Sequence, residues 1–318
     1  MGWHAWRMSN PEISAPPRSA CERPAWMEQA LSNRPRRSRI VCSGRSLEVL
    51  EWGRSDAPGL LFLHGNGAHA DWWAFTAPFF AQDWHCVALS FSGMGGSSHA
   101  AGCYDNASRA QEILAAIPLC GPANGPVTIV AHSAGGYPAM VAAALTDRIA
   151  AIVSIDSAIV PRSHDARLPR PSVRPSRVYA GIEDAVSRFR FIPEAVEPDP
   201  AAVDYVARTS LVPAVDPETG SPGWTWSFDP ALYGQINNAG LAVLPARAGC
   251  PLALLIGGHS DLLDSEVVDH MRALYPAGSP FITIPEAGHH IMVERPLELV
   301  AALRALLSVW PAMQHGSA

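Results

Sequence analysis

The most regular feature of the chain is a series of short apolar runs separated by segments with helical periodicity. Strands buried on both faces have this continuous apolar pattern, whereas half-buried strands alternate. The apolar runs lie at 59–64, 85–91, 127–132, 149–156, 251–258 and 280–286, and the helix-like segments at 108–117, 135–146, 264–275 and 296–310. The alternation of strand and helix predicts an α/β fold with a mostly parallel, doubly wound sheet.

Two segments near the N-terminus have a different pattern. Residues 39–44 ("RIVCSG") and 46–53 ("SLEVLEWG") alternate apolar and polar positions around a short turn that contains glycine, which predicts an antiparallel sheet edge. Residues 1–37 are rich in Pro, Ser and Arg, and we expect a flexible N-terminal extension there. Met8 is a second candidate start, so residues 1–7 do not enter the fold prediction.

One interval interrupts the alternation. Residues 160–247 are far longer than an ordinary connection, so they need a structure or a function of their own. We therefore expect a core formed by 38–159 and 248–312, and a helical lid formed by 160–247. Five aromatic residues of the insert could either line the underside of the lid or pack a small core of the insert itself. They are Phe189, Phe191, Trp224, Trp226 and Phe228.

Composition excludes several classes of function. The net charge is −6, and all 23 basic residues are arginine, which argues against a nucleic-acid surface. Without lysine the chain can form neither a Schiff base nor the phosphate-binding lysine of a P-loop. The six cysteines lack CxxC spacing, and no stretch resembles a membrane span or a signal peptide. A cytoplasmic protein with reduced thiols is therefore expected.

The run at 127–132 ends directly on "HSAGG", with Ser133 between the strand and a helix-like segment. A serine hydroxyl is a weak nucleophile at neutral pH and needs both a base and a site that stabilises the oxyanion. A sharp turn would expose the hydroxyl of Ser133, and the small residues Ala131, Gly135 and Gly136 would let strand and helix approach closely. A serine before a helix is also a common N-cap, so this motif alone is weak.

The base and its partner follow later in the chain. His289 comes just after the last predicted strand, and Asp261 follows the preceding one. The order nucleophile, acid, base is that of one known hydrolase architecture. Asp156, which ends an earlier strand, remains an alternative acid. His290 is adjacent to His289, but the Gly-His pairing favours His289 as the base.

Four stretches together make the chain resemble the α/β-hydrolase family from Arg39 to Trp310. They are "LFLHGNGAHADWW", "ALSFSGMGGSS", "VAHSAGG" and "AGHHIMVERP". The resemblance implies that the backbone amides of Asn66 and Ala134 form the oxyanion hole. The chain departs from the family pattern at Ala131, where glycine is usual, and at Ser90, where aspartate is usual. Neither change affects the expected triad.

Other histidines have plainer roles in this interpretation. We expect His64 to make a structural hydrogen bond, as it does in the family motif, and His132 to pack beside the nucleophile. His69 and Asp71 suggest a metal site, but neither HExxH nor the HxHxDH pattern is present. We expect no metal and no cofactor.

The sequence therefore predicts a serine hydrolase that cleaves a small apolar ester or lactone through Ser133, His289 and Asp261. A carbon–carbon bond hydrolase of diketone-like aromatic breakdown products, or a non-catalytic ligand-binding relative, remains as an alternative. Dehalogenase and epoxide hydrolase chemistry needs a carboxylate in place of Ser133. No nucleic-acid or membrane partner is expected, and both a monomer and a homodimer remain open. The expected substrate-binding residues are Trp72, Trp73, Trp224 and Trp226.

Overall fold

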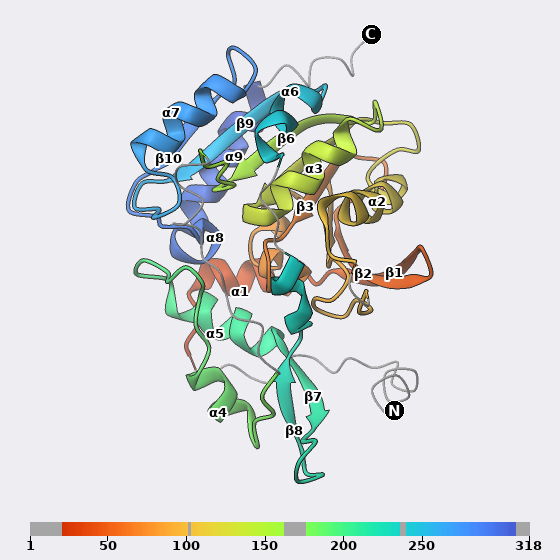
Figure 1. Ribbon diagram of the computed structural model, residues 1–318, viewed down its shortest axis with the longest axis vertical. Helices are drawn as coiled ribbons and strands as arrows, with labels where there is room; N and C mark the ends of the chain where they lie inside the picture. The colour runs from red at the N-terminus through yellow and green to blue at the C-terminus, as the bar shows by residue number, and fades with distance from the viewer. Residues whose placement is uncertain (1–20, 101–102, 162–175, 236–239, 310–318) are drawn as a thin grey trace.

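The computed structural model describes residues 21–100, 103–161, 176–235 and 240–309 (Figure 1). An eight-stranded sheet has the order β1-β2-β4-β3-β5-β6-β9-β10. The two pairs β1–β2 and β2–β4 are antiparallel, and the remaining pairs are parallel. The strands are β1 (Arg36–Cys42), β2 (Arg45–Trp52), β3 (Gly59–Leu63), β4 (His85–Leu89), β5 (Val127–His132), β6 (Ile149–Ile155), β9 (Leu252–Gly257) and β10 (Phe281–Ile284). The predicted mostly parallel α/β sheet is confirmed.

Helices follow most parallel strands. The helices of the sheet region are α1 (Ala25–Ser32), α2 (Asn106–Ala116), α3 (Gly136–Ala143), α7 (Ser265–Leu274), α8 (Ile291–Glu294) and α9 (Pro296–Val309), with 3₁₀ helices η1 (Ala70–Trp73), η2 (Ala77–Phe80), η3 (Ile117–Leu119) and η4 (Ser133–Gly135). Asp105 and Asp264 cap α2 and α7, since their side chains accept hydrogen bonds from the amides of Ser108 and Val267.

The sheet separates two apolar cores because successive side chains of a strand point to opposite faces. In β3, Leu60 and Phe62 pack with α1, α9 and η1, whereas Leu61 and Leu63 pack with α2, α3 and α7. Both faces are therefore covered, which explains the continuous apolar runs.

The N-terminal prediction is wrong in part. Residues 1–20 lie outside the described residues, but 25–32 form α1, whose Met27 and Ala30 are buried in the first core. Trp26 packs edge-on against Phe75, with ring centroids 6.4 Å apart. This helix is stabilised by tertiary packing, which local composition does not reveal.

The insert is not wholly helical. Its elements are α4 (Ile182–Ser187), α5 (Pro200–Thr209), β7 (Leu211–Val215), β8 (Pro222–Trp226), η6 (Pro230–Gln235), η7 (Leu241–Val243) and α6 (Leu244–Arg247). Strands β7 and β8 form an antiparallel hairpin, which extends away from the large sheet at the bottom of Figure 1. The alternating burial of β7 identifies the period-two pattern that the helical prediction missed. Most of the Pro/Arg-rich piece, 162–175, lies outside the described residues.

The insert is fastened to the core at several points. Ala202 and Val206 of α5 belong to the first apolar core. Farther along, the Tyr104 hydroxyl donates to Asp229 over 2.6 Å, and the amide of Asp229 donates to the Gly93 carbonyl over 2.7 Å. Each of the six cysteines is a free thiol. Among the described residues, none of the helices combines the length and hydropathy of a membrane span.

Candidate active site

Ser133 lies in a strained turn at the carboxyl end of β5. Its φ is +50°, in the left-handed region that residues other than glycine rarely adopt. The turn continues through η4 into α3. Strain of this kind is concentrated at functional sites, where surrounding structure holds it in place.

The glycines near Ser133 are needed for close approach. A Cβ on Gly135 would lie 2.6 Å from the His64 carbonyl oxygen, and one on Gly65 would lie 3.0 Å from Cβ of Ser133. The loop after β3 and the turn after β5 therefore meet with no room for larger residues, as the sequence predicted for Gly135.

His289 is paired with a buried carboxylate. It lies between β10 and α8, and its Nδ1 is 2.7 Å from Oδ2 of Asp156, the residue after β6. The same carboxylate accepts hydrogen bonds from the Gly257 amide (3.0 Å) and the Ser260 hydroxyl (2.6 Å). Asp156 is fully buried and has a φ of +48°. Its charge is therefore stabilised by three donors and directed at the imidazole.

This geometry corrects the expected partner of His289. Asp261 is exposed in a turn before α7, whereas Asp156, the alternative left open, makes the hydrogen bond. Strands β6 and β9 are adjacent and parallel, so their carboxyl ends lie side by side at the same edge of the sheet. Sequence order alone cannot decide between two aspartates placed in this way.

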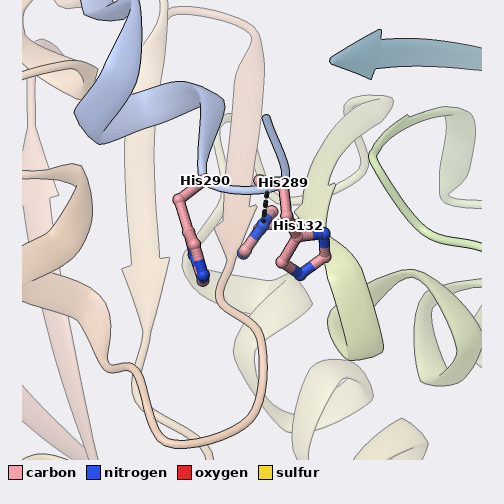
Figure 2. A group of neighbouring side chains, drawn as sticks. All are labelled: His132, His289 and His290. Carbon is pink, nitrogen blue, oxygen red and sulfur yellow. Dashed lines mark hydrogen bonds between the residues drawn. The ribbon is translucent and has the colours of Figure 1, made fainter. Parts of the chain in front are cut away.

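His289 and the serine turn are in contact through His132. Nε2 of His132 lies 3.0 Å from the backbone oxygen of His289, and the two rings are 4.8 Å apart (Figure 2). Because Nδ1 of His289 donates to Asp156, Nε2 is the nitrogen that remains for a neighbouring hydroxyl. Burial lowers the pKa of His132 well below its usual value, so this ring is neutral at pH 7.

His64 orients the amide of Asn66. Its Nε2 accepts from the Phe91 amide (3.0 Å), so Nδ1 carries the proton and donates to the Gly65 carbonyl oxygen (2.7 Å). Burial lowers the pKa of His64 to about 3, which keeps this tautomer neutral. Because a trans peptide is planar, fixing the Gly65 carbonyl also fixes the direction of the Asn66 N–H.

Ser157 acts in the same way on the second amide. Its hydroxyl donates to the backbone oxygen of Ser133 over 2.7 Å, which fixes the Ser133–Ala134 peptide and hence the Ala134 N–H. Each amide predicted for the oxyanion hole thus belongs to a peptide whose carbonyl is held by a buried side chain. No motif in the sequence pointed to Ser157, although it directly follows Asp156.

Two further buried charged groups support these loops. Glu294 accepts hydrogen bonds from the amides of Val196 (3.1 Å), His290 (3.2 Å) and Gly288, and burial raises its pKa. Arg109 donates through Nη1 to Oδ1 of Asn66 over 2.9 Å. For Glu294 the sequence signal was a charged residue after an apolar run, whereas Arg109 stands among polar residues of α2 and had no such signal.

Of the predicted tryptophans, only Trp72 lies beside the histidines. Its ring is 6.1 Å from that of His290 and 5.8 Å from that of Phe191, which in turn lies 4.8 Å from His290. Trp73 is fully buried and packs on Phe62 at 5.2 Å, so its expected place at a substrate is wrong. Successive residues of η1 point in different directions, and only one reaches the site.

Trp224 and Trp226 belong to the insert's own small core, the second of the two alternatives. Both pack against a cluster formed by Tyr179, Ala185 and Leu211. Trp226 also lies 5.5 Å from Phe189, ring to ring. Their side chains stabilise the hairpin against α4.

The residues that suggested a metal have structural partners. Nε2 of His69 lies 3.0 Å from the Ser210 hydroxyl, and Asp71 forms an ion pair with Arg37. At the unusual Ser90, the hydroxyl donates to Glu48 of β2 over 3.1 Å. Glu48 also accepts from the Gly96 amide (2.9 Å), so it supplies the carboxylate that the family usually has at position 90.

Comparisons with known proteins agree with the fold described above. In a search of solved structures, E-2-(acetamidomethylene)succinate hydrolase aligns with a TM-score of 0.74 and 20% identity over 86% of this chain and 100% of that one. The thioesterase domain from the curacin biosynthetic pathway gives 0.70 and 20% over 87% and 99%. An esterase from Mycobacterium tuberculosis gives 0.68 and 18% over 92% and 100%. These identities indicate a shared fold.

The sequence profile of the "Alpha/beta hydrolase family" matches residues 60–303. This match includes Ser133, Asp156 and His289. The chain belongs to the α/β-hydrolase family.

Proposed function

We propose that the protein is a serine hydrolase that cleaves a carboxylic ester or lactone through Ser133, His289 and Asp156. One observation carries the proposal: Nδ1 of His289 lies 2.7 Å from the buried Asp156 carboxylate, and its ring lies 4.8 Å from that of His132, which directly precedes a serine with a φ of +50°. A nucleophile, a base and an orienting acid converging in this way are typical of triad chemistry.

The reaction follows from the roles of the three side chains. The Ser133 hydroxyl attacks the substrate carbonyl while Nε2 of His289 takes its proton, and Asp156 stabilises the resulting imidazolium. His289 then returns the proton to the leaving alkoxide, which leaves an acyl group on Ser133. Water, deprotonated by His289, attacks this acyl-enzyme and releases the acid and the free serine.

The negative oxygen formed in each attack would be stabilised by the amides of Asn66 and Ala134. Groups aligned before the reaction need no reorganisation when charge develops. His64 and Ser157 provide this alignment through their hydrogen bonds to Gly65 and to Ser133.

The aromatic rings beside the site support an apolar substrate. Trp72 and Phe191 lie edge to face, and both face the imidazole of His290. Phe191 belongs to the insert, whose nearby Pro193 and Val196 backbone groups bond to His290 and Glu294. We propose that the insert is a cap over this region and that Phe191, rather than Trp224 or Trp226, contributes to substrate selection.

A fluorophosphonate probe tests the nucleophile directly. We expect the probe to modify Ser133, because only an activated serine reacts readily. Peptide mapping by mass spectrometry locates the modified residue, and Ser133→Ala should show no modification. Modification of another serine that abolishes activity would refute the proposed site. Product analysis with p-nitrophenyl esters, lactones and β-diketones then separates ester cleavage from carbon–carbon cleavage.

Loss of the Ser157 hydroxyl tests the second oxyanion donor. We expect Ser157→Ala to lower kcat for a p-nitrophenyl ester by roughly 10- to 100-fold with little change in KM, because a misdirected donor weakens transition-state binding. The matched control is Ser154→Ala, at another buried serine, in β6. Equal effects of both changes on kcat, with equally lowered melting temperatures, would assign Ser157 a packing role only.

A further inference from the structure

Three imidazoles lie close together at His132, the residue before Ser133, and the proposed reaction uses only that of His289. His132 comes from β5, whereas His289 and His290 precede α8 (Figure 2). One ring nitrogen of each lies within 4.8 Å of the others, and all three side chains are buried.

Hydrogen bonds determine which nitrogen of each ring remains available. Nε2 of His132 lies 3.0 Å from the His289 carbonyl oxygen, and Nε2 of His290 lies 3.0 Å from the Pro193 carbonyl oxygen. A carbonyl oxygen only accepts, so both Nε2 atoms carry protons. In each of these two rings Nδ1 is buried and has no hydrogen-bond partner among the described residues.

This arrangement suits a metal ligand. Metal-binding histidines usually donate their second nitrogen to a carbonyl or carboxylate, which fixes the tautomer. Each of the three rings does so. His132 and His290 donate to carbonyl oxygens, and Nδ1 of His289 donates to the carboxylate of Asp156.

We propose that His132, His289 and His290 form a binding site for a divalent transition-metal ion such as Zn²⁺. Imidazole nitrogen is a preferred ligand of this class of ion, and three such ligands leave a fourth position open. With Zn–N bonds of about 2.0–2.1 Å, tetrahedral ligands lie roughly 3.3 Å apart, so the nitrogens need to approach by at most about 1.5 Å. The carboxylate of Asp156 accepts the hydrogen bond of Nδ1 of His289, so a negative charge lies on the side of this ligand that faces away from the metal.

Binding has a consequence for the proposed hydrolase. A metal on Nε2 of His289 removes the lone pair that accepts the Ser133 proton, so the ion inhibits the enzyme. This part of the inference rests on the proposed function, whereas metal binding itself does not.

Isothermal titration calorimetry of ZnCl₂ into untagged, chelator-treated full-length protein tests the site. We expect one zinc ion per chain, and roughly 100-fold weaker binding by His290→Ala. Ser133→Ala should bind as the wild type does, because Ser133 supplies no ligand. The control His270→Ala changes a histidine of α7 and should also leave affinity unchanged. Absence of binding, or unchanged affinity of His290→Ala, would overturn the site.

Ester hydrolysis measured in parallel tests the inhibition. Activity should fall with zinc at the concentration at which calorimetry shows saturation, and excess EDTA should restore it. If zinc binds through His290 but does not lower the activity, the proposed inhibition is refuted and the proposed metal site is supported. A protein with no hydrolase activity would refute the proposed function, and calorimetry would still decide the metal site.

Discussion

Replacing Ser133 with alanine should lower kcat/KM for a p-nitrophenyl ester by roughly 10⁴- to 10⁶-fold, as the loss of a triad member does in serine hydrolases. No other described feature could replace the covalent step, because His289 then has no hydroxyl to activate. The residual rate would come from substrate binding and the oxyanion amides alone. Steady-state kinetics with purified protein measures the loss.

Two comparisons make this result specific. Ser308→Ala, on the exposed surface of α9, should retain the wild-type rate. The melting temperature of Ser133→Ala should change little, since alanine carries the same Cβ at the same left-handed φ and the change removes only one hydroxyl from a half-buried side chain. Retention of more than about one tenth of the activity by Ser133→Ala would refute nucleophilic catalysis at this serine.

Asp156→Asn should lower kcat about 10⁴-fold, whereas Asp261→Asn should leave it nearly unchanged. An asparagine at 156 can turn its NH₂ group toward Nδ1 of His289. Nδ1 then accepts a hydrogen bond from this group, so the proton of the imidazole resides on Nε2. In that tautomer the imidazole cannot act as a base toward Ser133. Asp261, exposed before α7, has no part in this geometry.

The two variants are matched in chemistry and differ only in position. Both should be purified as folded proteins with circular dichroism spectra like that of the wild type. If Asp261→Asn lost more activity than Asp156→Asn, the hydrogen bond between His289 and Asp156 would be structural, and the acid would have to be reassigned.

The layered core was predictable because strands buried on two faces are recognisable without knowledge of their neighbours. Runs such as 59–64 and 127–132 are apolar at nearly every position, and the structure places them in the adjacent strands β3 and β5. Helix α1 and the β7–β8 hairpin were not predicted. Both depend on distant contacts, such as that of Trp26 with Phe75, which composition cannot show.

Part of the candidate site was predictable from the sequence in the same way. Ser133 and His289 stand in local motifs, so their positions followed from short stretches of sequence. The choice between Asp156 and Asp261 depended on which of two adjacent strand ends faces the imidazole, a question of three-dimensional register. Ser90 and Glu48 show the same limit, because the missing carboxylate is supplied from a strand more than 40 residues earlier.

The position of Asp156 has an evolutionary consequence. Two adjacent residues directly after β6 have separate roles. Asp156 orients His289, and Ser157 holds the peptide after Ser133 through its hydrogen bond to the Ser133 carbonyl oxygen. In the loop after β9, the Ser260 hydroxyl donates a hydrogen bond to the Asp156 carboxylate. Among relatives that use the proposed triad, we therefore expect variation at position 261 and in the length of the turn beyond Ser260. Substitutions at 156 or 157 should be rare among relatives that remain active.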